Sequence, residues 1–268
     1  ELAGASDAEF AAARALALEL EETKRLEGRD AAKRREAEEW LPRFGNLSTY
    51  GICARDYASF TEEQRELVAE LLGAGRFHLA TTGALADGRE VLLTHAGVTM
   101  REVNLLGVAP TPRAIADALE QLFAEAVATR RPGQPLSLEP VALAGSPGEE
   151  AGGLLAHRPT NPAREGADPT WELDPERPRR FAPQELPADL TQIAGHTNHA
   201  SCLRELAAFA TPEARARRHA GIRTLRATAD AAIYDLGILP PLPGAADLIL
   251  IDGELRDPAN RAELLVLV

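Results

Sequence analysis

The sequence contains little cysteine: Cys53 and Cys202 are the only two in 268 residues. So small a number argues against a scaffold held together by disulfides and fits a reducing compartment. No apolar run approaches the roughly 18 to 20 residues that a membrane helix needs, and the N-terminus lacks the basic and apolar segments of a secretory signal. We therefore expect a cytoplasmic protein without a membrane partner.

Basic residues are also scarce, because 29 Lys and Arg stand against 41 Asp and Glu, for a formal net charge of −12. Such a surface repels phosphate backbones, which argues against nucleic acid as a main partner. A small anionic substrate stays possible, since a bound divalent cation can dominate the field inside a cleft. With 45% hydrophobic residues, the chain is expected to bury a substantial core as one domain over residues 1–268.

Residues 1–41 are expected to form a helical N-terminal segment. A capping box that opens at Ser6 starts an amphipathic helix, which breaks near Gly28. A charge-rich second helix is expected from Asp30 to Trp40, mostly in contact with water. A further helix is expected between a capping box at Thr61 and Gly73.

Strand patterns begin after these helices. Residues 77–82 and 90–94 predict two strands joined by a tight hairpin at Asp87-Gly88, and Thr111-Pro112 marks another helix start. Residues 131–187 are rich in Pro, Gly and charge, which predicts an irregular connection that faces the active site. The later patterns predict a strand over 190–194, a helix over 201–208, and strands over 221–227, 231–236 and 248–251.

Three places combine a glycine-containing turn with a side chain that can bind a metal. They carry Asn46, His95 and His196, in the motifs Gly45-Asn46, Thr94-His95-Ala96-Gly97 and Gly195-His196-Thr197. Both histidines are expected at strand ends, where functional groups collect. Neutral imidazole and amide oxygen suit Mn, Fe or Zn. The three residues together therefore predict half of a metal site.

The order of these motifs resembles that of calcineurin-like metallophosphoesterases, in particular the branch with protein serine/threonine phosphatases and diadenosine tetraphosphatases. The resemblance spans about Pro42 to Asp252. It implies an α+β fold, a four-layer α/β/β/α sandwich with the site at the strand ends, here incomplete at the N-terminus. It also implies that Asn46, His95 and His196 ligate one metal. Two divalent ions, manganese foremost, would then activate water for hydrolysis of a phosphate ester.

Two further residues are candidates for binding substrate. Arg158 is the candidate for the substrate phosphate, because a guanidinium fork matches phosphate geometry. His199 follows His196 by three residues and is the second candidate. The expected substrate is a small phosphomonoester, a dinucleoside polyphosphate or a phosphoprotein. Each residue alone also has a structural interpretation: Asn46 as a turn, the histidines as hydrogen-bonded structural residues, and Arg158 as a solvated loop charge.

The sequence departs from the family in two ways. It has neither the Asp-x-His pair nor the Gly-Asp motif before Asn46, and Leu47 stands where the family has a histidine. Either a segment upstream of Glu1 carries the missing motifs, which is the simpler explanation for them, or the site is not functional. The alternative function is a catalytically silent binding or regulatory module. A structural site for a single metal is a third interpretation.

Overall fold

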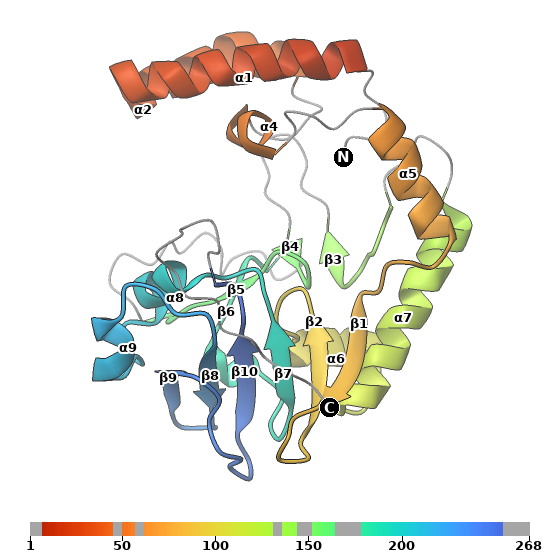
Figure 1. Ribbon diagram of the computed structural model, residues 1–268, viewed down its shortest axis with the longest axis vertical. Coiled ribbons are helices and arrows are strands. Elements are labelled where there is room, and N and C mark those ends of the chain that lie inside the picture. The colour runs from red at the N-terminus through yellow and green to blue at the C-terminus, as the bar shows by residue number, and fades with distance from the viewer. Residues whose placement is uncertain are drawn as a thin grey trace. The chain divides into compact units, whose positions relative to one another are not determined.

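The structure, a computed structural model, describes residues 7–44, 50–56, 62–130, 136–143, 152–163 and 178–253. It is a mixed α and β protein whose chain divides into two compact units, one helical and one built on a sheet (Figure 1). The helical unit comprises Glu1–Phe77, Ala124–Ser137 and Ala144–Ala151. The sheet unit comprises His78–Phe123, Leu138–Leu143 and Gly152–Val268. That residues 1–268 form a single domain stays a prediction.

The helical unit confirms the expected N-terminal helices. Its elements are α1 (Asp7–Glu27), α2 (Arg29–Arg35), the π-helix η1 (Glu36–Trp40), α3 (Leu41–Phe44), α4 (Tyr50–Asp56) and α5 (Glu62–Gly73). Gly28 separates α1 from α2 with a φ of 95°, a conformation that only glycine adopts readily. The capping residues Ser6 and Thr61 lie outside the described residues.

A small aromatic core holds this unit together. Trp40 is 1% exposed and its ring lies against those of Phe44 and Tyr50, with centroids 5.3 and 6.4 Å away. The apolar face of α1 packs on the same cluster through Leu16 and Leu20. The charge-rich stretch up to Trp40 was expected mostly in water, and most of its residues are exposed or half-buried, whereas Ala32 and Trp40 are buried.

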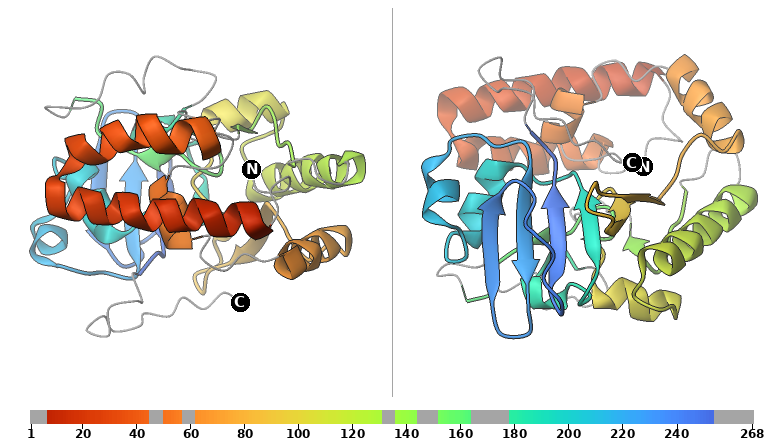
Figure 2. Two further views of the ribbon diagram at one scale, coloured as in Figure 1. Left: turned by 90° about the horizontal axis from the view of Figure 1, so that it is seen from above. Right: turned by 60° about the horizontal axis from the view of Figure 1, so that its bottom comes forward.

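The sheet unit is built on six strands in the order β1-β2-β7-β10-β8-β9 (Figure 2, right). Strands β2, β7 and β10 are parallel, while β1, β8 and β9 run antiparallel to their neighbours. The strands are β1 (Ala80–Ala84), β2 (Glu90–Thr94), β7 (Thr191–Ala194), β8 (Arg223–Ala227), β9 (Ala232–Leu236) and β10 (Ala246–Leu250). These strands were predicted, although β1 begins three residues later than expected.

Both faces of this sheet are buried, as is usual for parallel strands. Ile193 and Ile249 point to one face, and the alternate residues Ala194, Leu248 and Leu250 join the cluster on the other. The second cluster also contains residues of α8 (His199–Leu206) and α9 (Pro212–Ala216). The remaining helices of the unit are α6 (Met100–Leu106) and α7 (Pro112–Thr129), whose last residues belong to the helical unit.

The described parts of 131–187 contain only short elements. They are β3 (Ala142–Leu143), β4 (Gly152–Gly153), β5 (Arg158–Pro159), β6 (Arg180–Phe181) and the 3₁₀-helix η3 (Pro183–Glu185). Strand β5 pairs with β6, and β3 pairs with β4. The mixed α and β class is thus established, whereas the four-layer sandwich stays a prediction. Within the described ranges, no helix is long and apolar enough to cross a membrane.

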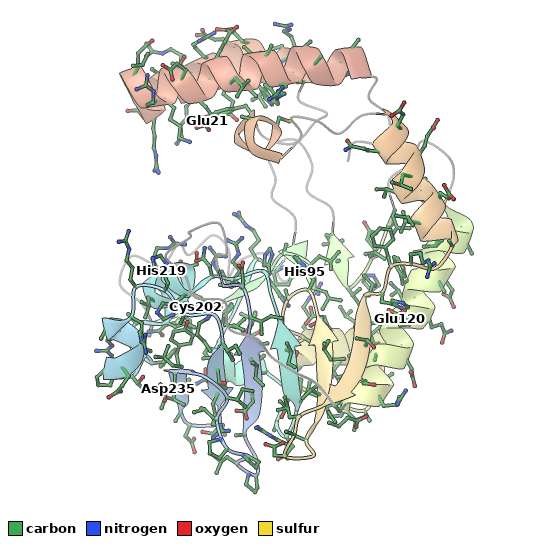
Figure 3. All side chains as sticks on the ribbon, in the orientation of Figure 1. Glu21, His95, Glu120, Cys202, His219 and Asp235 are labelled. Atoms are coloured by element: carbon green, nitrogen blue, oxygen red, sulfur yellow. The ribbon has the colours of Figure 1, made fainter. Side chains whose placement is uncertain are left out.

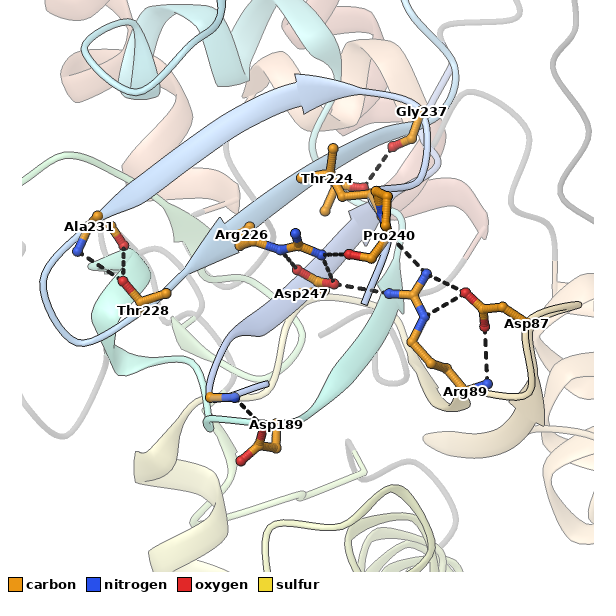
Figure 4. Close-up of polar contacts among 12 residues, drawn as sticks. Asp87, Arg89, Asp189, Thr224, Arg226, Thr228, Ala231, Gly237, Pro240 and Asp247 are labelled. Atoms are coloured by element: carbon orange, nitrogen blue, oxygen red, sulfur yellow. Dashed lines mark hydrogen bonds and ion pairs between the residues drawn. The ribbon is translucent and has the colours of Figure 1, made fainter. Parts of the chain in front are cut away.

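An arginine–aspartate cluster, formed by Arg89, Asp247 and Arg226, lies where the parallel strands begin (Figure 4). Arg226 donates to both carboxylate oxygens of Asp247, from Nε at 2.6 Å and from Nη2 at 2.7 Å. Arg89 Nη1 donates to the same carboxylate at 3.1 Å, and its Nη2 donates to the Leu239 carbonyl at 2.9 Å. The Asp247 side chain is only 5% exposed, so the cluster ties β2, β8 and β10 together in a largely buried setting.

Candidate functional site

The parallel pairing of β2 and β7 brings two predicted site residues to one edge of the sheet. Thr94 lies opposite Ala194 in this pairing, so the residues that follow leave the sheet side by side. The Gly195 amide donates to the His95 carbonyl at 3.1 Å, which extends the ladder one step past the strands. His95 and His196 therefore emerge next to each other, at the end where His95 is labelled in Figure 3.

The two imidazoles form a close pair, called here the histidine pair. His95 Nε2 lies 3.0 Å from His196 Nδ1, and the ring centroids are 4.8 Å apart. His196 has a φ of 62°, in the left-handed region that costs a non-glycine residue about 1–2 kcal/mol. Strained backbone of this kind concentrates at functional sites.

The far side of the His196 ring meets β5 and the residues before it. Its Nε2 lies 3.0 Å from the Ala156 carbonyl oxygen, and Arg158 Nε approaches the same nitrogen at 3.3 Å. If Nε2 carries the proton, it donates to Ala156, and Nδ1 keeps a lone pair directed at His95. In the other tautomer Nε2 accepts from Arg158 and Nδ1 donates to His95. A backbone carbonyl that fixes the tautomer in this way is the usual partner of a metal-binding histidine.

Burial keeps both imidazoles neutral. Desolvation lowers the pKa of His95, although the nearby negative charge of Asp252 partly offsets this. Desolvation and then the Arg158 charge lower the pKa of His196 to about 4. Both rings can therefore offer an unprotonated nitrogen near neutral pH, which metal binding requires.

The geometry of the histidine pair fits one metal ion. Two nitrogen ligands at about 2.1 Å from a common ion lie roughly 3.0 to 3.4 Å apart, depending on the coordination geometry. The nitrogens of the pair are 3.0 Å apart, at the lower end of that range. Their donor type suits the first-row metals named above. Among the described residues, however, no group of three His, Cys, Asp or Glu side chains could hold a metal.

The turn that carries His95 is fixed from behind by buried polar groups. Gln192 Oε1 accepts from the Val98 amide at 2.7 Å, and its Nε2 donates to the Val98 carbonyl at 2.8 Å. His157, which is 1% exposed, contacts the Gly97 carbonyl through Nε2, and its ring packs at a tilt of 60° against that of Phe181. These contacts leave the backbone after His95 little freedom to move.

Arg223 joins the loops that follow β7 and β10. It is fully buried, and its Nη2 donates to the Thr197 carbonyl at 2.7 Å. Its Nη1 donates to the carbonyls of Asp252 at 2.7 Å and Ala220 at 2.6 Å. One guanidinium group therefore fixes the residue after His196 and the residue whose charge acts on His95.

The predicted substrate residues have different surroundings. Arg158 lies beside the histidine pair, as described above. His199 is 2% exposed, with Nδ1 2.7 Å from the Tyr234 hydroxyl and Nε2 3.2 Å from the Ala214 carbonyl. In the structure His199 is thus a core residue away from the pair, because the helix that starts at Asn198 turns it inward. Asn46 and Leu47 lie outside the described residues.

Sequence reasoning missed several contributors to this edge. Asp252 follows the third parallel strand as His95 and His196 follow the other two, so the same strand-end signal could have identified it. Nothing in the sequence marks the role of Arg223, because two of the carbonyls that it binds, those of Thr197 and Asp252, are 26 and 29 positions away. Cys202 is buried, and burial raises the pKa of its thiol.

Comparisons with models of known protein families, with curated proteins and with solved structures find no match for this chain. Any functional conclusion therefore depends on the chemistry of the site itself.

Proposed function

We propose that this chain hydrolyses a phosphate ester at the histidine pair, with a metal-activated water as the nucleophile. One observation carries the proposal: two neutral imidazoles from adjacent parallel strands face each other at 3.0 Å, with a guanidinium beside them. Two lone pairs at this distance repel each other unless a proton or a cation lies between them. A proton shared in a hydrogen bond satisfies the pair without metal, and a cation bound between the two lone pairs would lie next to a group that binds phosphate.

Each residue has a distinct part in this proposal. His95 Nε2 and His196 Nδ1 would hold the cation, and the Ala156 carbonyl would keep the proton of His196 on Nε2. Arg158 would bind the phosphate, because its positive charge and its paired N–H donors match the phosphate oxygens. Asn46 is proposed as a further ligand, on the strength of the sequence resemblance alone.

The expected cofactor is a pair of divalent ions, manganese foremost. When bound, such ions stabilise the charge on phosphoryl oxygens and make water acidic enough to act as a nucleophile near neutral pH. The described residues supply nitrogen donors for one ion, and ligands for a second ion have to come from elsewhere. The four-layer metallophosphoesterase sandwich and a small phosphorylated substrate or phosphoprotein belong to the same proposal.

A catalytically silent binding module is the second candidate. It is favoured because no group of three His, Cys, Asp or Glu side chains among the described residues could hold a metal ion. Such a module would bind a phosphorylated partner through Arg158 and the imidazoles without turning it over. Turnover is the property that separates the two candidates.

The test is hydrolysis of para-nitrophenyl phosphate by the full chain with added manganese, compared with His95→Ala and His196→Ala. We expect either change to lower kcat/KM by about two orders of magnitude or more, because the ion loses a ligand. Arg158→Ala should raise KM roughly tenfold, since a charge-assisted hydrogen bond to phosphate is lost. The matched control is His78→Ala, a histidine of the same unit whose side chain is 63% exposed and paired with Glu120.

The outcomes separate the candidates clearly. Turnover that needs manganese and both paired histidines, but not His78, supports the enzyme. Binding of phosphate that depends on Arg158, without any turnover, supports the module. Turnover that survives in His95→Ala and His196→Ala would contradict the proposed site.

A further inference from the structure

A concave site opens at the edge of the sheet unit that carries the histidine pair. It is a cavity of about 570 Å³, within the range typical of small-molecule sites. It lies where β9 ends and the chain approaches β8. Figure 3 labels one of its residues, His219, at the same end of the sheet as His95. Its lining consists of Arg217, His219, Ala220, Ile222, Leu236, Gly237 and Ile238.

The lining combines aliphatic side chains with positive charge. Ile222, Leu236 and Ile238 offer apolar surface, while Arg217 and His219 supply the polar groups. No acidic residue lines the cavity among the described residues, although the chain as a whole carries a formal charge of −12. Within the described part of the chain, the Arg217 guanidinium has no ion-pair partner. Such a cavity is suited to an anionic group attached to an apolar body.

Arg223 connects this cavity to the histidine pair. Its Nη1 donates to the carbonyl of Ala220, a lining residue, and to the Gly221 carbonyl at 3.2 Å. Its Nη2 donates to the carbonyl of Thr197, the residue after His196. A single buried guanidinium group therefore hydrogen-bonds both the cavity wall and the loop that carries His196, which holds the two places in a fixed arrangement.

We infer that this cavity binds the part of the substrate that remains after phosphate is removed, and that this part is an apolar group bearing a second anionic charge. The assignment to a substrate rests on the proposed phosphoesterase function, whereas the ligand class rests on the lining alone. The preferred substrate is thus a phosphate ester with two separate anionic groups, one at the histidine pair and one at Arg217.

Binding can be measured without catalysis. The probes are 4-hydroxyphenylacetate and its neutral analogue 4-hydroxyphenylacetamide, titrated calorimetrically into the metal-free full chain. We expect the acid to bind about tenfold more tightly than the amide, because charge-assisted hydrogen bonds are worth about that much. Arg217→Glu should remove this preference and leave amide binding within about twofold. Arg215→Glu, the same change at an exposed residue of α9 outside the lining, is the matched control.

Turnover then tests the link to the substrate. With manganese, the wild type should show a KM about tenfold lower for 4-(carboxymethyl)phenyl phosphate than for phenyl phosphate. Arg217→Glu should equalise the two values. Equal binding of acid and amide overturns the inference, as do equal KM values for the two esters in the wild type. Absence of turnover with both esters contradicts only the proposed function, because calorimetry measures binding of 4-hydroxyphenylacetate without any turnover.

Discussion

The two edges of the six-stranded sheet differ in how their polar groups are satisfied. Where the parallel strands begin, Asp247 lies between two arginines that neutralise it and bond both of its oxygens. Where they end, two neutral imidazoles face each other, and His196 has a strained backbone. One edge is arranged for stability, and the other keeps backbone strain and a pair of neutral imidazoles, as functional sites do.

The largest expected effect on stability is at the first edge. Asp247→Asn removes the negative charge between Arg89 and Arg226, whose side chains are only 14% and 12% exposed. Arg89 would keep its pair with Asp87, but Arg226 would lose its carboxylate partner, and an unpaired buried charge should lower the free energy of unfolding by about 3–5 kcal/mol. Urea denaturation followed by circular dichroism measures this. A loss below about 1 kcal/mol would mean that the cluster does not hold the edge together.

Strain at the second edge predicts a difference between two substitutions of the same residue. His196→Gly and His196→Ala both remove the imidazole, but only glycine adopts a φ of 62° without cost. The glycine variant should therefore be more stable than the alanine variant by about 1 kcal/mol, because the extra entropy that glycine loses on folding offsets part of the strain of about 1–2 kcal/mol. Paired urea denaturations of the two proteins provide the measurement. An alanine variant that is more stable than the glycine variant would show that the left-handed backbone at this position carries no strain.

The histidine pair also predicts a dependence of stability on pH. The pKa of His196 lies at about 4 in the folded state, against 6.5 as its ordinary value, and that of His95 is lowered as well. At pH values between the two, the unfolded chain binds more protons than the folded chain. The free energy of unfolding should therefore fall as the pH drops from about 6.5 to about 4. Solvent screening of the part-exposed rings limits the contribution of His196 to about 1 kcal/mol.

Urea denaturation midpoints measured across this pH range test the expected fall in stability. In the variant with both His95→Asn and His196→Asn, stability should depend less steeply on pH. The variant His78→Asn, which replaces an exposed histidine, should keep the pH dependence of the wild type. An unchanged slope in the double variant would contradict the burial argument for the pair.

The smallest effect is expected at the rim of the arginine–aspartate cluster. Asp87 pairs with Arg89 at 2.9 Å, but its side chain is 40% exposed. Exposed ion pairs contribute little, so Asp87→Asn should lower the free energy of unfolding by less than about 1 kcal/mol. Urea denaturation alongside Asp247→Asn would show the contrast directly. An equal loss in both variants would mean that burial does not decide the strength of these pairs.

Local patterns predicted most of the elements. The Asp87-Gly88 pair gave the hairpin, and Thr111-Pro112 gave the start of α7. Helix α6 was missed although Thr99 and Glu102 form a capping box, and α9 was missed although Thr211-Pro212 repeats the signal used for α7. These omissions were avoidable, because the signals lie within the sequence.

Other features could not be predicted from local sequence. Asp247 and Arg89 are 158 positions apart, so only the sheet order brings them together. The Ala156 carbonyl that contacts His196 is a backbone group. Every residue has such a group, so the residue type at position 156 does not predict the contact. His196 and His199 are only three positions apart, yet the helix start between them directs one to the edge and the other into the core.

The central claim is that His95 and His196 bind one cation together, and metal binding tests it most directly. Calorimetric titration of manganese into the full chain should show binding that weakens by about 100-fold or more in His95→Ala and in His196→Ala. The double variant should bind no more weakly than either single variant, because the two imidazoles act on the same ion. Unchanged manganese affinity in both single variants would contradict the account.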